Sequence, residues 1–205
     1  MTGRKTNSEK TKKLVVLAIL SAIIVVLQCF CSVLSIPGLN VAITLTLVPI
    51  LVGVAMYGVS AGAILGAVFG VIVLITDPTA KMLMQPGLLQ AIATGVLCIG
   101  KGVLAGVAGG LVYKLVARKS EASQLLGIIL AGVVAPVVNT GTFILGMLIF
   151  FKDTIFGWSA GSPSFAYFVI VGLCGLNFVV ELVVNLVLST AISTIVKAAR
   201  NAVKN

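Results

Sequence analysis

The 205-residue sequence contains no histidine, only five acidic residues and a single tryptophan. Histidine is the commonest general base and metal ligand, so its absence removes the usual starting point of a catalytic or metal site. The four cysteines lie in or beside apolar runs, where a free thiol behaves as a small hydrophobic side chain; they are Cys29, Cys31, Cys98 and Cys174. We therefore expect a protein that is not an enzyme and needs no metal, cofactor or disulfide.

Charge is also scarce, because charged residues make up 9% of the chain and hydrophobic residues 60%. A soluble domain carries about 25% charged residues, which excludes a large water-soluble domain. The apolar runs predict an all-α fold, an integral membrane bundle of six transmembrane helices over residues 14–196, between basic tails at residues 1–13 and 197–205. The predicted spans are Leu14–Leu34, Val41–Tyr57, Ala61–Thr76, Leu88–Val116, Leu125–Phe151 and Phe165–Val196.

The net charge of +9 indicates the orientation of the chain in the membrane rather than nucleic-acid binding, because most of the cations fall in three short polar segments. These are Arg4, Lys5, Lys10, Lys12 and Lys13; Lys114, Arg118 and Lys119; and Lys197, Arg200 and Lys204. With an even number of spans all three lie on one side, which the positive-inside rule makes the cytoplasm. We expect both termini to be cytoplasmic in a multi-pass protein of the cell membrane.

Small and helix-breaking residues mark special places within the spans. Glycines four residues apart predict two smooth helix faces for close packing; they are Gly62, Gly66 and Gly70, and Gly102, Gly106 and Gly110. Pro136 and the Asn-Thr-Gly stretch that follows it are expected to interrupt the fifth span. Trp158, in the loop after that span, is expected to anchor at the membrane interface.

A polar stripe runs through the last apolar stretch. Asn177, Glu181 and Asn185 are spaced four residues apart, so on a helix they share one face. A carboxylate at membrane depth costs about 2.5 kcal/mol or more on insertion scales, and it usually faces a partner, a ligand or water. The stripe therefore predicts one wall of a polar pocket, with polar contact between helices as the alternative.

Lys101, Asn139 and Thr140 are polar residues of two other spans. Counted at about 1.5 Å per residue from the outer ends of their helices, Lys101, Asn139 and Asn177 lie at similar depths, and Glu181 slightly deeper. This convergence predicts a pocket near the membrane midplane, under the outer loops. The alternative is a buried Lys101–Glu181 ion pair that holds the bundle together, and the two interpretations are compatible.

The order of these motifs resembles the substrate-binding (S) components of energy-coupling factor (ECF) transporters, which are bacterial vitamin importers. The resemblance covers almost the whole chain and rests on the size, the six spans, the basic N-terminus and five motifs. These are Ala18-x-x-x-Ala22, residues 45–50 (LTLVPI), Gly66-x-x-x-Gly70, Pro136-Val-Val-Asn139-Thr140-Gly141, and Asn177 to Asn185 with Glu181 between them.

The resemblance implies a mechanism. An S component binds a vitamin from outside, docks through its first helix on a transmembrane coupling (T) subunit that two ATPases drive, and then releases the vitamin inside. By position, Ala18 and Ala22 would be the docking contacts. The loops Ser35–Asn40 and Asp77–Gly87 would cover the site.

The ligand is the least specified part of the resemblance. Lys101 and the Asn-Thr-Gly stretch suggest a pantothenate-type member, in which Lys101 neutralises the carboxylate while Asn139 and Asn177 bond the amide and hydroxyls. Riboflavin or another vitamin is an alternative ligand. A stand-alone secondary transporter and a small membrane scaffold are the alternative classes.

Overall fold

A computed structural model describes residues 2–33, 45–85, 87–118, 120–173 and 175–204 of the chain. These residues form helices joined by short connections, with no strand among them, so the predicted all-α class is confirmed. The elements are α1 (Thr2–Val33), α2 (Leu47–Tyr57), α3 (Val59–Thr76), α4 (Pro78–Leu83), α5 (Leu88–Val116), α6 (Glu121–Phe150), α7 (Lys152–Ser159), α8 (Phe165–Tyr167), the π-helix η1 (Phe168–Leu173) and α9 (Gly175–Lys204).

Five of the described helices are long and apolar enough to cross a membrane, and they lie in α1, α3, α5, α6 and α9. The second predicted span is shorter than expected, because α2 has 11 residues. At about 1.5 Å per residue, such a helix reaches only about half of a ~30 Å hydrocarbon core. Residues 41–44 of that span lie outside the described residues, so the sixth crossing stays a prediction.

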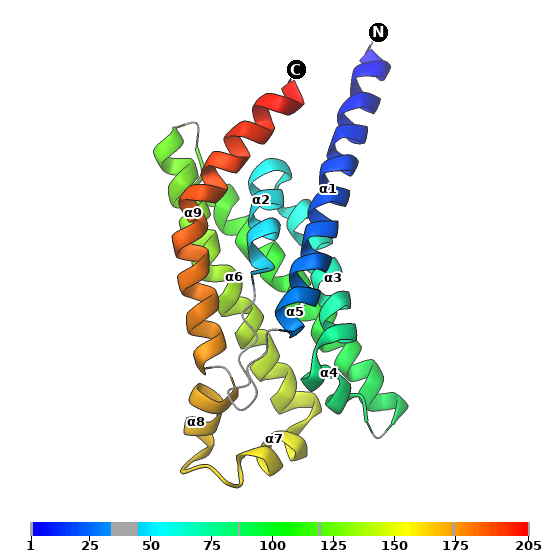
Figure 1. The fold of residues 1–205 in the computed structure, drawn as a ribbon, viewed down its shortest axis with the longest axis vertical. Coiled ribbons are helices and arrows are strands. Elements are labelled where there is room, and N and C mark those ends of the chain that lie inside the picture. The colour runs from blue at the N-terminus through cyan, green and yellow to red at the C-terminus, as the bar shows by residue number, and fades with distance from the viewer. Residues whose placement is uncertain (1, 34–44, 86, 119, 174, 205) are drawn as a thin grey trace.

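Both ends of the chain lie at the same end of the bundle, as Figure 1 shows. The short helices α4, α7 and α8 lie at the opposite end. This arrangement agrees with the expectation that the termini share one side, while the assignment of that side to the cytoplasm stays a prediction. For clarity, the end that carries α4, α7 and α8 is called the distal end.

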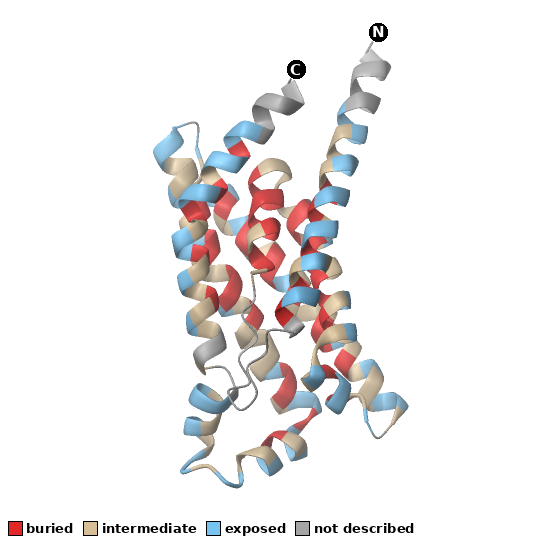
Figure 2. Cartoon of the chain, viewed as in Figure 1, coloured by how far each residue is buried: buried red, intermediate tan, exposed pale blue. Residues whose placement is uncertain are grey.

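α2 lies at the centre of the bundle. Its residues from Pro49 to Ala55 are all buried, and it packs against α1, α3, α5, α6 and α9. Large apolar side chains on the other helices face outward, including Leu14, Val26 and Ile149, each about two-thirds exposed. Figure 2 shows this division, with buried residues on the inner helix faces. Outward apolar faces and an apolar interior are expected where the surrounding solvent is lipid.

The two glycine faces pack against each other. A Cβ atom added at Gly62 would overlap the carbonyl oxygen of Gly106, and one at Gly66 would overlap that of Gly102. One turn further along, a Cβ at Gly70 would come 2.5 Å from the carbonyl oxygen of Cys98. The prediction of close packing is confirmed. Because α3 and α5 touch backbone to backbone, they form a closely fitted antiparallel pair.

Two predicted spans differ from the structure in whether the helix is continuous. α6 continues through Pro136 and Asn139 without a break, because a proline removes only one helix hydrogen bond and the packing of α5 and α9 on either side holds the helix together. The final predicted span, in contrast, is divided. It forms α8, the π-helix η1 and then α9.

Candidate functional site

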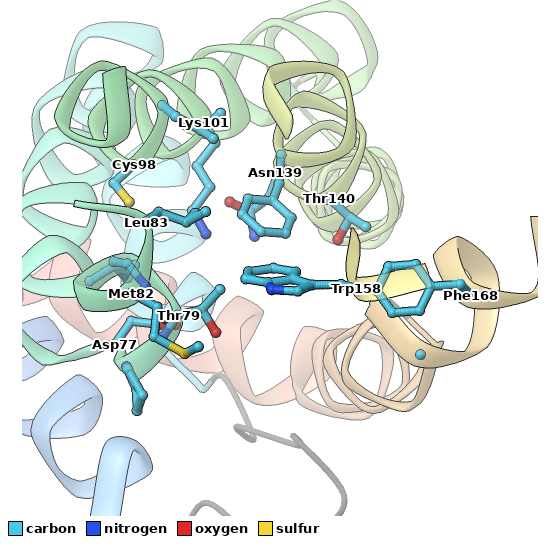
Figure 3. Close-up of a pocket in the computed structure, with 16 residues that line it drawn as sticks. Asp77, Thr79, Met82, Leu83, Cys98, Lys101, Asn139, Thr140, Trp158 and Phe168 are labelled. Atoms are coloured by element: carbon cyan, nitrogen blue, oxygen red, sulfur yellow. Dashed lines mark hydrogen bonds between the residues drawn. The ribbon is translucent and has the colours of Figure 1, made fainter. Parts of the chain in front are cut away.

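A cavity of about 480 Å³ lies at the distal end of the bundle, within the usual size range of small-molecule sites. α3 to α6, α7 and η1 all contribute to its wall. Its polar lining consists of Asp77, Thr79, Cys98, Lys101, Asn139 and Thr140. Its apolar lining includes Leu83, Leu97, Phe143, Trp158 and Phe168. Figure 3 shows these side chains around the cavity.

Lys101 supplies the only lysine or arginine side chain among the residues that line the cavity. Side chains on a helix lean toward its N-terminus, which for α5 is the distal end, so the Lys101 side chain points toward that end. Its Nζ lies 5.0 Å from the centroid of the Phe143 ring, a cation–π contact. This contact holds the ammonium inside the cavity.

Lys101 forms no salt bridge in the part of the chain that the structure describes. All five acidic residues of the sequence are described, and the ion pair among them joins Lys197 to Glu121 at 2.8 Å. The predicted pair between Lys101 and Glu181 is therefore not formed. Since an ammonium at membrane depth needs a partner, the cavity is suited to an anionic group.

Asn139 lines the same cavity, and the oxygen of its side-chain amide is unsatisfied. Its side chain is 8% exposed, and its Oδ1 has no hydrogen-bond partner among the described residues. A buried acceptor left without a donor costs about 1–3 kcal/mol. Thr140 follows Asn139 on α6 and also lines the cavity. A ligand that donates a hydrogen bond to Asn139 would remove this cost.

Asp77 is a cavity residue that our sequence analysis placed only in a covering loop. Its Oδ1 accepts hydrogen bonds from the backbone N–H groups of Thr79 at 2.7 Å and Ala80 at 3.2 Å, which caps α4. Pro78 occupies the first turn, where a missing N–H costs nothing. The Asp-Pro-Thr sequence was the available signal, because an acidic N-cap followed by proline is typical of a helix start.

Aromatic residues close the other side of the cavity. Trp158 lines the cavity from α7, and its expected place at the membrane interface stays a prediction. The rings of Phe156 and Phe165 are stacked with centroids 4.7 Å apart, so they join α7 to α8. Phe168 and Gly172 of the π-helix η1 complete this side. π-Helical turns occur frequently at functional sites, but no residue pattern in the sequence predicted this one.

A protein-family model described as "ECF transporter, substrate-specific component" matches residues 12–193. The chain belongs to this family. The family resemblance drawn from the sequence is therefore confirmed. No curated protein and no solved structure matched the chain.

Membership makes the protein a substrate-binding membrane subunit of an ECF transporter. Such a substrate-specific component works with T and ATPase subunits and takes a small-molecule substrate. Members of this family bind and deliver a substrate and do not convert it, so this role includes no catalysis.

The predicted polar stripe of this substrate-specific component does not line the cavity as a unit. Glu181 and Asn185 are each 1% exposed, and neither is among the residues that line the cavity. Asn185 instead faces α6, because a Cβ atom added at Gly132 of α6 would lie 3.5 Å from the Cβ atom of Asn185. The backbone of Asn177 belongs to α9, and its side chain lies outside the described residues.

The predicted docking residues lie on the outside of the ECF component. Ala18 and Ala22 are exposed on α1, one helical turn apart, while Leu17, Leu20 and Ile24 face the core. The two alanines therefore form a shallow strip on the outer face of α1. A strip of small residues lets another helix approach closely.

Proposed function

We propose that this ECF substrate-specific component captures a small, vitamin-like anion in the cavity at its distal end. The carboxylate of the ligand binds Lys101, and a donor next to it bonds Asn139. The observation that carries the proposal is the ammonium of Lys101, which shares the cavity with an unsatisfied amide and forms no salt bridge in the described part of the chain.

The lining favours pantothenate as the first ligand to test. Its carboxylate suits Lys101, and its amide and hydroxyls suit Asn139 and Thr140. Riboflavin is the alternative ligand, because Trp158, Phe143 and Phe168 offer aromatic surface for a flat ring. Riboflavin has no carboxylate, so its binding would contradict the role proposed for Lys101. The aromatic lining thus favours riboflavin more than the sequence did.

Delivery follows from coupling to other subunits. Ala18 and Ala22 dock on the T subunit, and two ATPase subunits supply the energy for release on the side of the termini. The exposure of both alanines on one strip of α1 supports this docking face. In this scheme the protein belongs to a bacterial cell membrane, with its cavity opening to the outside and its termini in the cytoplasm.

Three measurements test the proposal. Mass spectrometry of small molecules that co-purify with the protein identifies the ligand, and calorimetry with the ligand-free protein gives its affinity. Uptake into cells is then measured with and without the T and ATPase subunits. We expect a carboxylate ligand and uptake that requires the partners. An uncharged or cationic ligand would contradict the role of Lys101, and uptake by the protein alone would contradict the coupled mechanism.

A further inference from the structure

The cavity holds two opposite charges that do not neutralise each other. Lys101 and Asp77 both line it, yet no salt bridge joins them in the described part of the chain. Figure 3 shows Lys101 and Asn139 on one side of the cavity and Asp77 on another, with Trp158 beside the space that separates them. Each charge is therefore available to a ligand.

Asp77 keeps a free oxygen for such a contact. Both capping hydrogen bonds go to its Oδ1, and among the described residues no hydrogen bond reaches Oδ2. Capping also fixes the carboxylate in place, because two backbone N–H groups of α4 hold the same oxygen. An acceptor that is fixed in place loses little conformational freedom when a ligand donates to it.

The helix register places the two charges at different depths. Gly70 of α3 meets Cys98 of α5, and the two helices are antiparallel. Asp77, seven residues after Gly70, therefore lies about level with Ala91 of α5. Ala91 is ten residues before Lys101, which corresponds to ~15 Å along the helix axis. The Lys101 side chain leans toward the distal end and covers part of that length. Trp158, Phe143 and Leu83 add apolar surface to the lining of the same cavity.

We propose that Asp77 orients the ligand and selects its chemical class. The ligand is an elongated carboxylate whose acidic end binds Lys101 and whose outer end carries hydroxyl or ammonium donors that bind Oδ2 of Asp77. Asn139 bonds a donor near the acidic end. This inference rests on the proposed function, because it requires an anion at Lys101.

The test uses amides of β-alanine that share one carboxylate and differ at the other end. Pantothenate presents hydroxyls, N-(4-aminobutanoyl)-β-alanine presents an ammonium, and N-(3,3-dimethylbutanoyl)-β-alanine presents only methyl groups. Calorimetry measures their affinity for the wild type, Asp77→Asn and Lys101→Gln. Asparagine caps a helix as well as aspartate does, so Asp77→Asn removes the charge and keeps α4. Asp153→Asn is the matched control, because Asp153 is exposed on α7 and does not line the cavity.

We expect a donor-ended amide to bind more tightly than the methyl-ended one. Asp77→Asn should weaken the donor-ended amide about tenfold or more, leave the methyl-ended one within about twofold, and leave the melting temperature unchanged. Equal affinities of donor-ended and methyl-ended amides, or no effect of Asp77→Asn, would overturn the inference. The proposed function would stand in that case, provided that Lys101→Gln still weakened binding. Binding of none of the three amides would overturn the inference. Binding that is insensitive to Lys101→Gln would overturn the proposed function as well.

Discussion

Gly66 of α3 and Gly102 of α5 meet through their backbones, so that a Cβ atom on either residue would overlap the carbonyl oxygen of the other. Both helices carry cavity residues, since α3 holds Val73 and α5 holds Cys98 and Lys101. This contact therefore sets the distance between two walls of the site as well as the packing of the bundle.

Gly66→Ala is predicted to destabilise the protein. Its new methyl group must push α5 away, and overpacking of this kind costs about 1–3 kcal/mol. Gly100→Ala on α5 is the matched control, because nothing lies within 4 Å of a Cβ there. Melting curves of the purified variants should show a lower midpoint for Gly66→Ala and an unchanged or slightly higher one for Gly100→Ala. Equal midpoints would show that the helix pair accommodates the methyl group.

Lys101→Gln is predicted to weaken ligand binding about tenfold or more, because it removes a charge-assisted contact. Calorimetry with the co-purified ligand measures the change. Lys81→Gln serves as control, since Lys81 is exposed on α4 and does not line the cavity. If both variants bind equally well, the cavity does not recognise its ligand through the ammonium.

Replacing both Ala18 and Ala22 by leucine is predicted to abolish uptake and leave ligand affinity unchanged. The leucines fill the shallow strip on α1 that we assign to the T subunit, whereas the cavity lies on other helices. Uptake in cells and calorimetry on purified protein separate the two effects. Ala191→Leu is the matched control, because Ala191 is also exposed but lies on α9. Lost ligand binding in the double variant would contradict the docking assignment.

Glu181→Gln is predicted to lower stability more than ligand affinity. The side chain is buried, and disturbing a buried polar contact costs about 1–3 kcal/mol, while the cavity lining does not include it. Melting curves and calorimetry on the same preparation compare the two effects. Glu121→Gln is the control, because Glu121 is an exposed acid. Its replacement is expected to lower the free energy of unfolding by less than about 1 kcal/mol. A binding loss that exceeds the stability loss would restore Glu181 to the ligand site.

The parts of the structure that the sequence predicted follow from local rules. Glycines four residues apart must share a helix face, so close packing at Gly66 and Gly102 could be inferred without knowing the partner. Depth counted along straight helices brought Lys101 and Asn139 to one cavity. These inferences needed only the helical repeat and the bilayer thickness.

Other features depend on packing that the sequence does not state. The helical repeat puts Glu181 and Asn185 on one stripe, but the rotation of α9 decides whether that stripe meets the cavity or α6. Asp77 and Trp158 lie in segments that composition describes only as loops, and they reach the cavity because α4 and α7 are folded over it. Each of these placements requires contacts between distant parts of the chain.

The position of Trp158 gives the protein a built-in optical reporter. It is the single tryptophan of the sequence, and it lies in the cavity wall. Indole emission shifts with the polarity around the ring, so filling or emptying the cavity should change the fluorescence of the unlabelled protein. Occupancy could then be followed in real time, in detergent or in a bilayer, without attaching a dye.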